Sequence, residues 1–68
     1  MEIDIRKAII NNFKDSTEEN ITESIVESIK QGDEIVLPGL GVLFEILWNN
    51  SSSEEQKTIV DRLKKSLQ

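Results

Sequence analysis

One segment limits the possible folds more than any other part of the chain. Residues 35–48 read IVLPGLGVLFEILW, and Glu45 is their only charge. Apolar surface of this extent is stabilised by removal from water, so the segment must lie inside the fold or against a second copy. It is shorter than the roughly 20 residues of a membrane helix, and Pro38 and Gly39 interrupt it. We therefore expect no membrane partner.

The length and the residue types restrict how the chain becomes stable. The 68 residues predict one domain, 1–68, and a domain of this size buries only about 60% of its unfolded surface. The chain contains no Cys and no His, which excludes disulfides, zinc-finger spacings, and Cys/His or Ser/His catalytic pairs. Helix packing and self-association remain as sources of stability. We expect no metal ion and no cofactor.

The charge argues against nucleic acid as a partner. The net charge is −5 and the pI is near 4.6, whereas binding to phosphates draws on clustered Lys and Arg. The chain starts with MEIDIRKAIINN, which is charged from its second residue and has no apolar stretch of the signal-peptide kind. We therefore predict a cytoplasmic location.

Residues 3–14 predict the first helix. Ile5, Ile9 and Phe13 recur at four-residue steps, and polar residues fill the other side. This spacing places the three side chains on one face of an amphipathic helix. The β-branched residues lower the intrinsic helix propensity, so this helix needs tertiary packing.

Residues 16–31 predict the second helix, with a signal at each end. Ser16 and Glu19 have the S-x-x-E spacing of a capping box. Gly32 suits the left-handed conformation in which many helices end. Between these ends, isoleucines repeat every four residues, which again indicates one apolar face.

The central segment allows two interpretations. In both, Pro38 disfavours the α conformation at the residue before it, so residues 35–37 are expected to be an extended connector. In the first, a helix begins near Pro38, whose missing N–H costs nothing in a first turn. In the alternative, residues 35–37 and 42–46 pair as a hairpin in an α+β fold. The Leu and Trp content favours the helix.

Residues 53–66 predict the last helix, preceded by a serine-rich loop. Any of Ser51, Ser52 and Ser53 can cap it, because an acidic residue or Gln stands three positions after each. Ile59, Leu63 and Leu67 form its apolar stripe. The chain is therefore expected to be all-α, a small four-helix domain with a central apolar third helix.

Two features of the central segment could carry chemistry. The Gly39-x-Gly41 spacing resembles part of a phosphate loop, but it lacks the third Gly and the Lys. A tight entry into a helix explains it better. Glu45 is expected on a solvated edge or paired with a base such as Lys14, Lys30 or Arg62, because burial of an unpaired carboxylate is costly. No catalytic residue is predicted.

One face of the third helix is the candidate interface. A four-helix chain this small has little material to cover a helix that is apolar nearly all round, and Trp is enriched at interface hot spots. We therefore predict a homodimer, with any other protein partner unknown. The candidate interface residues are Leu40, Leu43, Phe44, Leu47 and Trp48.

The same segment resembles a known family. GDE at residues 32–34 and LPGLGVLFEILW at 37–48 are similar to the motif G-E-E-x-x-L-P-G-L-G-V-L-F-E-V-I-W of the small, acid-soluble spore protein I family. IRKAIINN at 5–12 resembles the family's L-R-K-A-V-I-x-N, and residues 25–32 fit its I-V-x-x-I-x-x-G. The resemblance covers nearly the whole chain.

This resemblance implies a function without catalysis. It implies a minor protein of the dormant spore core, made in the forespore during sporulation, with no assigned enzymatic activity and no catalytic residues. Our leading hypothesis is therefore a non-enzymatic spore-core protein that acts through self-association or partner binding.

A second resemblance supplies the alternative. SIKQGDEIVLPGLGVLFE, within residues 28–45, is similar to the helix, strand, turn and strand segment of HU-type histone-like proteins. It implies a nucleoid-associated DNA-binding module. The basic arm of HU is missing. In addition, Pro38 has no N–H to donate to the hydrogen bonds that would pair the two strands of an HU-like segment.

Overall fold

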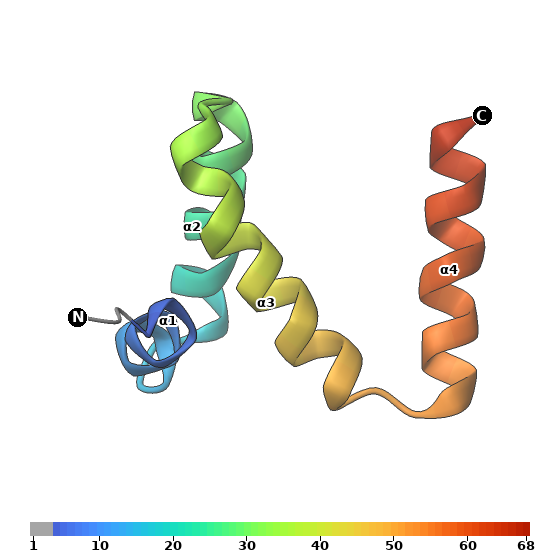
Figure 1. The fold of residues 1–68 in the computed structure, drawn as a ribbon, viewed down its shortest axis with the longest axis horizontal. Helices are drawn as coiled ribbons and strands as arrows, with labels where there is room; N and C mark the ends of the chain where they lie inside the picture. The colour runs from blue at the N-terminus through green and yellow to red at the C-terminus, as the bar shows by residue number, and fades with distance from the viewer. Residues whose placement is uncertain (1–3) are drawn as a thin grey trace.

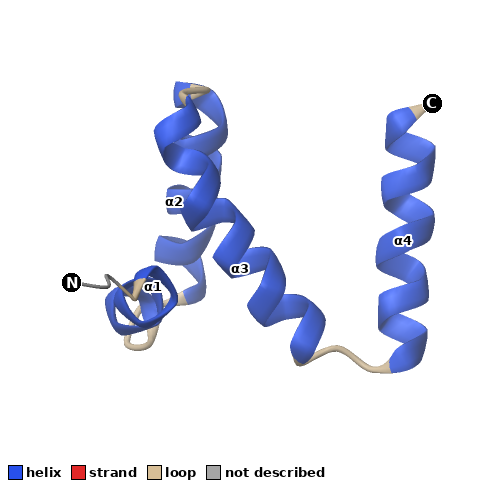
Figure 2. Cartoon of the chain, in the orientation of Figure 1, coloured by secondary structure: helices blue, strands red, loops and turns tan. Residues whose placement is uncertain are grey.

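Four α-helices joined by short connections make up the part of the chain that the structure, a computed structural model, describes: residues 4–68 (Figures 1 and 2). They are α1 (Ile5–Phe13), α2 (Glu18–Gln31), α3 (Leu37–Asn49) and α4 (Ser53–Leu67), and a short 3-10 helix, η1 (Glu34–Val36), precedes α3. The predicted all-α fold is confirmed. Within residues 4–68 there is no strand, so the alternative hairpin of 35–37 and 42–46 is wrong. The predicted first residue of α1, at position 3, lies outside the described residues.

The loss of the hairpin also removes the basis of the HU-like alternative. That resemblance requires a strand, a turn and a second strand after α2, and α3 occupies the same residues as a continuous helix. The segment therefore carries no structural likeness to the DNA-binding module.

The start of α2 differs by one residue from the prediction. Thr17, not Ser16, is the N-cap, and its hydroxyl accepts a hydrogen bond of 3.1 Å from the Asn20 N–H. The Ser16 hydroxyl instead donates to the Asn12 carbonyl, at 3.5 Å, at the end of α1. The predicted capping box of Ser16 and Glu19 is therefore wrong. A cap needs extended backbone at its own position, and Thr17 has it, with φ −76° and ψ 163°.

The end of α2 follows the prediction. Gly32 adopts φ 68° and ψ 8°, a conformation that side chains with a Cβ disfavour. Its N–H bonds to the Ser28 carbonyl, and the chain then leaves the helix axis.

The connector at 35–37 is helical, which corrects the extended prediction. Residues Glu34–Val36 form η1, and Leu37 has φ −60° and ψ −43° although Pro38 follows it. The steric preference before proline is outweighed because Pro38 stands in the first turn of α3, where no N–H is needed. The helix hypothesis for α3 is confirmed, with its start at Leu37.

A reciprocal capping box starts α4. The Ser52 hydroxyl accepts from the Glu55 N–H at 3.1 Å, and the Glu55 carboxylate accepts from the Ser52 N–H at 2.7 Å. Of the three serines that could cap this helix, Ser52 does so.

The helices pack mainly at one place. α1 crosses the beginning of α3, where Ile9 Cδ1 lies 3.8 Å from the position of a Cβ on Gly39. The side chain of Ile9 therefore lies in ordinary van der Waals contact with the first turn of α3. α4, in contrast, does not pack along any of the other helices and stands apart from them (Figure 1).

The single chain is open. No side chain in residues 4–68 is buried. The accessible surface is 6175 Å², against about 4,300 Å² for a compact protein of this mass. The radius of gyration is 13.4 Å, against about 11 Å for a compact chain of this length. About 1,900 Å² of surface per chain is therefore in excess of that of a compact fold.

Candidate functional site

An apolar groove between α2 and α3 contains most of the candidate interface. Its volume is about 380 Å³, and its lining is almost entirely apolar. The lining residues, called the inner groove below, are Ile21 and Ile25 of α2 with Leu40, Leu43, Phe44 and Leu47 of α3. Four of the five candidate interface residues thus come together, and α2 contributes two isoleucines that the prediction did not include.

The exposure of the inner groove changes along α3. Leu40 and Leu43, near α1, are half-buried. Phe44 is 43% exposed and Leu47 is 52% exposed. Each exposed side chain of this size forgoes a large part of the roughly 1.5–3 kcal/mol that full burial supplies. The second half of the groove is therefore the part that an additional apolar surface would stabilise most.

Trp48, the fifth candidate, lies at a separate hollow. Its ring stacks on Phe44, with ring centroids 6.1 Å apart and an interplanar angle of 29°. It lines a hollow of about 530 Å³ at the corner between α3 and α4, the corner hollow, with Gln56 and Val60 among its other lining residues. The stacked pair lies between the inner groove and the corner hollow, whose lining also includes Lys57, Asp61 and Lys64 of α4.

The corner between α3 and α4 is held by hydrogen bonds. The Gln56 side chain donates to the Trp48 carbonyl at 2.9 Å. The Asn50 amide donates to the Ile46 carbonyl at 2.8 Å, and the Ser51 hydroxyl donates to the Leu47 carbonyl at 2.6 Å. The bonds from Asn50 and Ser51 lie within the end of α3, and the bond from Gln56 joins α4 to the last turn of α3.

The apolar stripe of α4 is turned toward the inside of the corner. Because Gln56 contacts the end of α3, the side of α4 that carries Gln56 faces inward. At 3.6 residues per turn, four apolar residues fall within about 60° of Gln56 around the helix. They form the α4 stripe, which consists of Ile59, Val60, Leu63 and Leu67.

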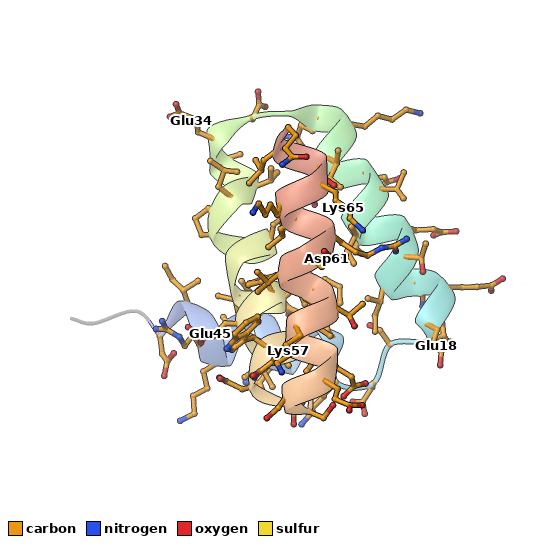
Figure 3. The ribbon with its side chains drawn as sticks, turned by 90° about the vertical axis from the view of Figure 1, so that its right-hand side faces the viewer. Glu18, Glu34, Glu45, Lys57, Asp61 and Lys65 are labelled. Carbon is orange, nitrogen blue, oxygen red and sulfur yellow. The ribbon has the colours of Figure 1, made fainter. Side chains whose placement is uncertain are left out.

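Figure 3 shows α4 in front of α2 and α3, and Figure 1 shows α1 and α4 on opposite sides of α3. The inner groove lies between α2 and α3, and in Figure 3 α4 stands in front of these two helices. The inner groove and the α4 stripe are thus two apolar walls that face each other without packing. The sequence showed the stripe of Ile59, Leu63 and Leu67 but gave no signal that it would be left uncovered.

Glu45 is a structural ion-pair residue. The Arg6 guanidinium donates two hydrogen bonds to its carboxylate, from Nε at 2.6 Å and from Nη2 at 3.0 Å. The partner is therefore Arg6 of α1, and none of the predicted Lys14, Lys30 or Arg62. The hydrogen bond from Arg6 holds the pKa of Glu45 below its ordinary value of 4.5, which keeps it ionised rather than poised for proton transfer.

Residues 4–68 lack three further kinds of site: a phosphate loop, a cluster of acidic side chains for a metal ion, and a membrane-spanning helix. Gly39 and Gly41 lie inside α3, so they form no phosphate loop. Within residues 4–68 there is no group of three or more acidic side chains arranged to hold a metal ion. None of the helices in this range is both long and apolar enough to cross a membrane.

Comparison with known proteins shows which family the chain resembles. The profile of the family described as Small, acid-soluble spore protein I matches residues 3–67. A protein of that name from Geobacillus sp. (strain WCH70) is 37% identical over 67 residues, which are 98% of this chain and 94% of the relative. Proteins of the same name from Bacillus cereus (strain AH187) and Bacillus anthracis (strain CDC 684 / NRRL 3495) are also 37% identical, over 98% of this chain and 97% of theirs.

No solved structure matches the chain. None of the names of the family and of these relatives refers to an enzyme. The family match covers the apolar segment, the helix caps and the α4 stripe together. The chain therefore belongs to the small, acid-soluble spore protein I family.

Proposed function

We propose that this chain is a non-enzymatic minor protein of the dormant spore core, made in the forespore during sporulation, which acts through self-association as a homodimer. Membership of the spore protein family supports the setting. The observation that carries the self-association is the open single chain, in which no side chain of residues 4–68 is buried.

The excess surface has the size of a dimer interface. Each chain exposes about 1,900 Å² more than a compact protein of its mass. Two chains that covered this surface against each other would bury about 3,800 Å² in total, within the roughly 2,000–5,000 Å² of obligate homodimers. A second copy is therefore a sufficient partner.

Self-association can be measured as solution mass by light scattering across a dilution series. We expect the wild-type chain to have twice the monomer mass at high concentration. Leu47→Glu adds a charge where the side chain is half-exposed in the single chain, so the variant is expected to stay helical. Its dimer should dissociate with a dissociation constant at least tenfold higher than that of the wild type. Asn49→Glu, at the exposed end of the same helix, is the matched control and should remain dimeric.

The setting can be tested separately. A fluorescent fusion expressed from the native promoter in a spore-forming host should appear in the forespore and persist in the core of the dormant spore. Fluorescence confined to the mother cell or the spore coat would contradict this location. A wild-type chain that stays monomeric at high concentration would contradict self-association.

A further inference from the structure

The inner groove and the α4 stripe have a relation that self-association alone does not explain. They face each other across the corner between α3 and α4, and α4 packs along no other helix. Val60, Leu63 and Leu67 are 50%, 47% and 84% exposed. The space between the two walls is therefore lined by apolar side chains from both sides. Exposure of these apolar surfaces to water is unfavourable.

Resting on the proposed dimer, we propose that the two copies interlock: the α3–α4 pair of each copy enters between the inner groove and the α4 stripe of the other. In this arrangement α3 and α4 of one copy occupy two diagonal corners of a four-helix bundle. The partner's α3 and α4, running in the opposite direction, occupy the other two. All four apolar faces then point to one shared centre.

The geometry of the corner favours this arrangement over closure of α4 onto its own chain. One hydrogen bond, from the Gln56 side chain to the Trp48 carbonyl, joins α4 to the end of α3. Closure would move Gln56 away from its place beside this carbonyl. Interlocking keeps the bond, because each α4 remains where its corner places it. A two-fold axis at 45° to both diagonals relates the copies, which is the symmetry of most homodimers.

The charges agree with a second copy beside α4. α2 carries four glutamates and one lysine, a net charge of −3, whereas α4 carries four basic and three acidic residues, a net charge of +1. Interlocking brings α4 of one copy close to the α2 and α3 of the other, so opposite charges meet at the rim. Complementary charge at the rim steers association and fixes its register.

Leu63→Glu tests whether the α4 stripe belongs to the dimer interface. We expect a chain that keeps its helical circular dichroism and dimerises at least tenfold more weakly than wild type. Thr58→Glu, on the opposite face of α4, is the matched control and should dimerise as wild type. If Leu63→Glu stays dimeric while Leu47→Glu dissociates, the dimer stands and the interlocked arrangement is overturned. If the wild-type chain is itself a monomer, both proposals fail.

A distance measurement keeps the test open should Leu63→Glu not fold. Since the chain has no Cys, spin labels can be attached at Glu27→Cys on α2 and Thr58→Cys on α4, and the labelled chain diluted into excess unlabelled protein. If helices of the partner lie between α2 and α4, we expect the distance between the two labels of one chain to be larger than that between directly packed helices. Shortening to the separation of directly packed helices, whose axes lie about 8–10 Å apart, would show closure onto the same chain and overturn the proposal.

Discussion

The contact between Arg6 and Glu45 shows how one charge can lie in an apolar helix at little cost. Glu45 projects from the side of α3 that meets α1, and the guanidinium binds both of its carboxylate oxygens. Both side chains remain more than a third exposed, so neither charge is stripped of water. The pair orients α1 on α3, and the second apolar side of α3 is left free for the inner groove.

This pair predicts a pH-dependent difference between wild type and Glu45→Gln. The pKa of Glu45 is lowered in the folded chain, chiefly by the hydrogen bond from Arg6. Its stabilisation is therefore present above the ordinary value of 4.5 and lost as the pH falls through the lowered pKa. We expect Glu45→Gln to melt at a lower temperature than wild type at pH 7, and the two to converge near pH 2.

Glu27→Gln is the control for this comparison, because Glu27 forms no ion pair within residues 4–68. It should change the melting temperature at pH 7 less than Glu45→Gln does. A difference between wild type and Glu45→Gln that persists unchanged at low pH would contradict the role given to the ion pair.

At the scale of the helices, the ends are set by single hydrogen bonds that sequence spacing identifies only to within a residue. Thr17→Ala removes the hydroxyl that accepts from the Asn20 N–H, and loss of an N-cap costs about 1 kcal/mol. Ser16→Ala removes only a long contact with the Asn12 carbonyl. We expect urea denaturation to show a loss of stability for Thr17→Ala that is clearly larger than for Ser16→Ala. A loss for Ser16→Ala as large as that for Thr17→Ala would contradict the cap at Thr17.

The capping box of α4 gives a second prediction at this scale. Ser52→Ala removes the acceptor for the Glu55 N–H and should destabilise the chain by about 1 kcal/mol in urea denaturation. Ser53→Ala, at the first helical position, where the serine makes no side-chain hydrogen bond within residues 4–68, should have little effect. Because α4 packs along no other helix in the single chain, its cap matters more than one in a core. A neutral Ser52→Ala would show that partner contacts alone order α4.

The sequence predicted most of the helices because their signals are local. The repeats of Ile5, Ile9 and Phe13, and the glycine at position 32, depend on spacing and on backbone conformation alone. The connector at 35–37 was mispredicted because the rule for residues before proline competes with the tolerance of helix starts for proline, and only the surrounding chain decides which wins. The partner of Glu45 was also missed, since Arg6 is 39 residues away in sequence and no local pattern joins them.

The lining of the inner groove was predicted in part, because part of it follows from local spacing. Leu40, Leu43, Phe44 and Leu47 share a helical face, so their grouping follows from the period of the helix. That Ile21 and Ile25 complete the inner groove depends on how α2 packs against α3. That the α4 stripe remains uncovered depends on the direction in which the chain turns between α3 and α4, where the Gln56 side chain bonds to the Trp48 carbonyl.

At the scale of the whole molecule, the chain lacks what stabilises most small domains. It has no disulfide, and no side chain in residues 4–68 is fully removed from water. Helix propensity and capping alone rarely hold helices of 9 to 15 residues. Stability of the folded chain should therefore come largely from apolar surface that a second copy covers, so association should stabilise the folded helices.

The dependence of the melting temperature on protein concentration tests this account most directly. A folded chain that associates is stabilised by mass action, so its melting temperature rises with concentration. We predict a steady rise across a hundredfold range of wild-type concentration, and a lower melting temperature for Leu47→Glu than for wild type at every concentration. A wild-type melting temperature that is independent of concentration would show that the single chain is stable by itself, and would contradict the account.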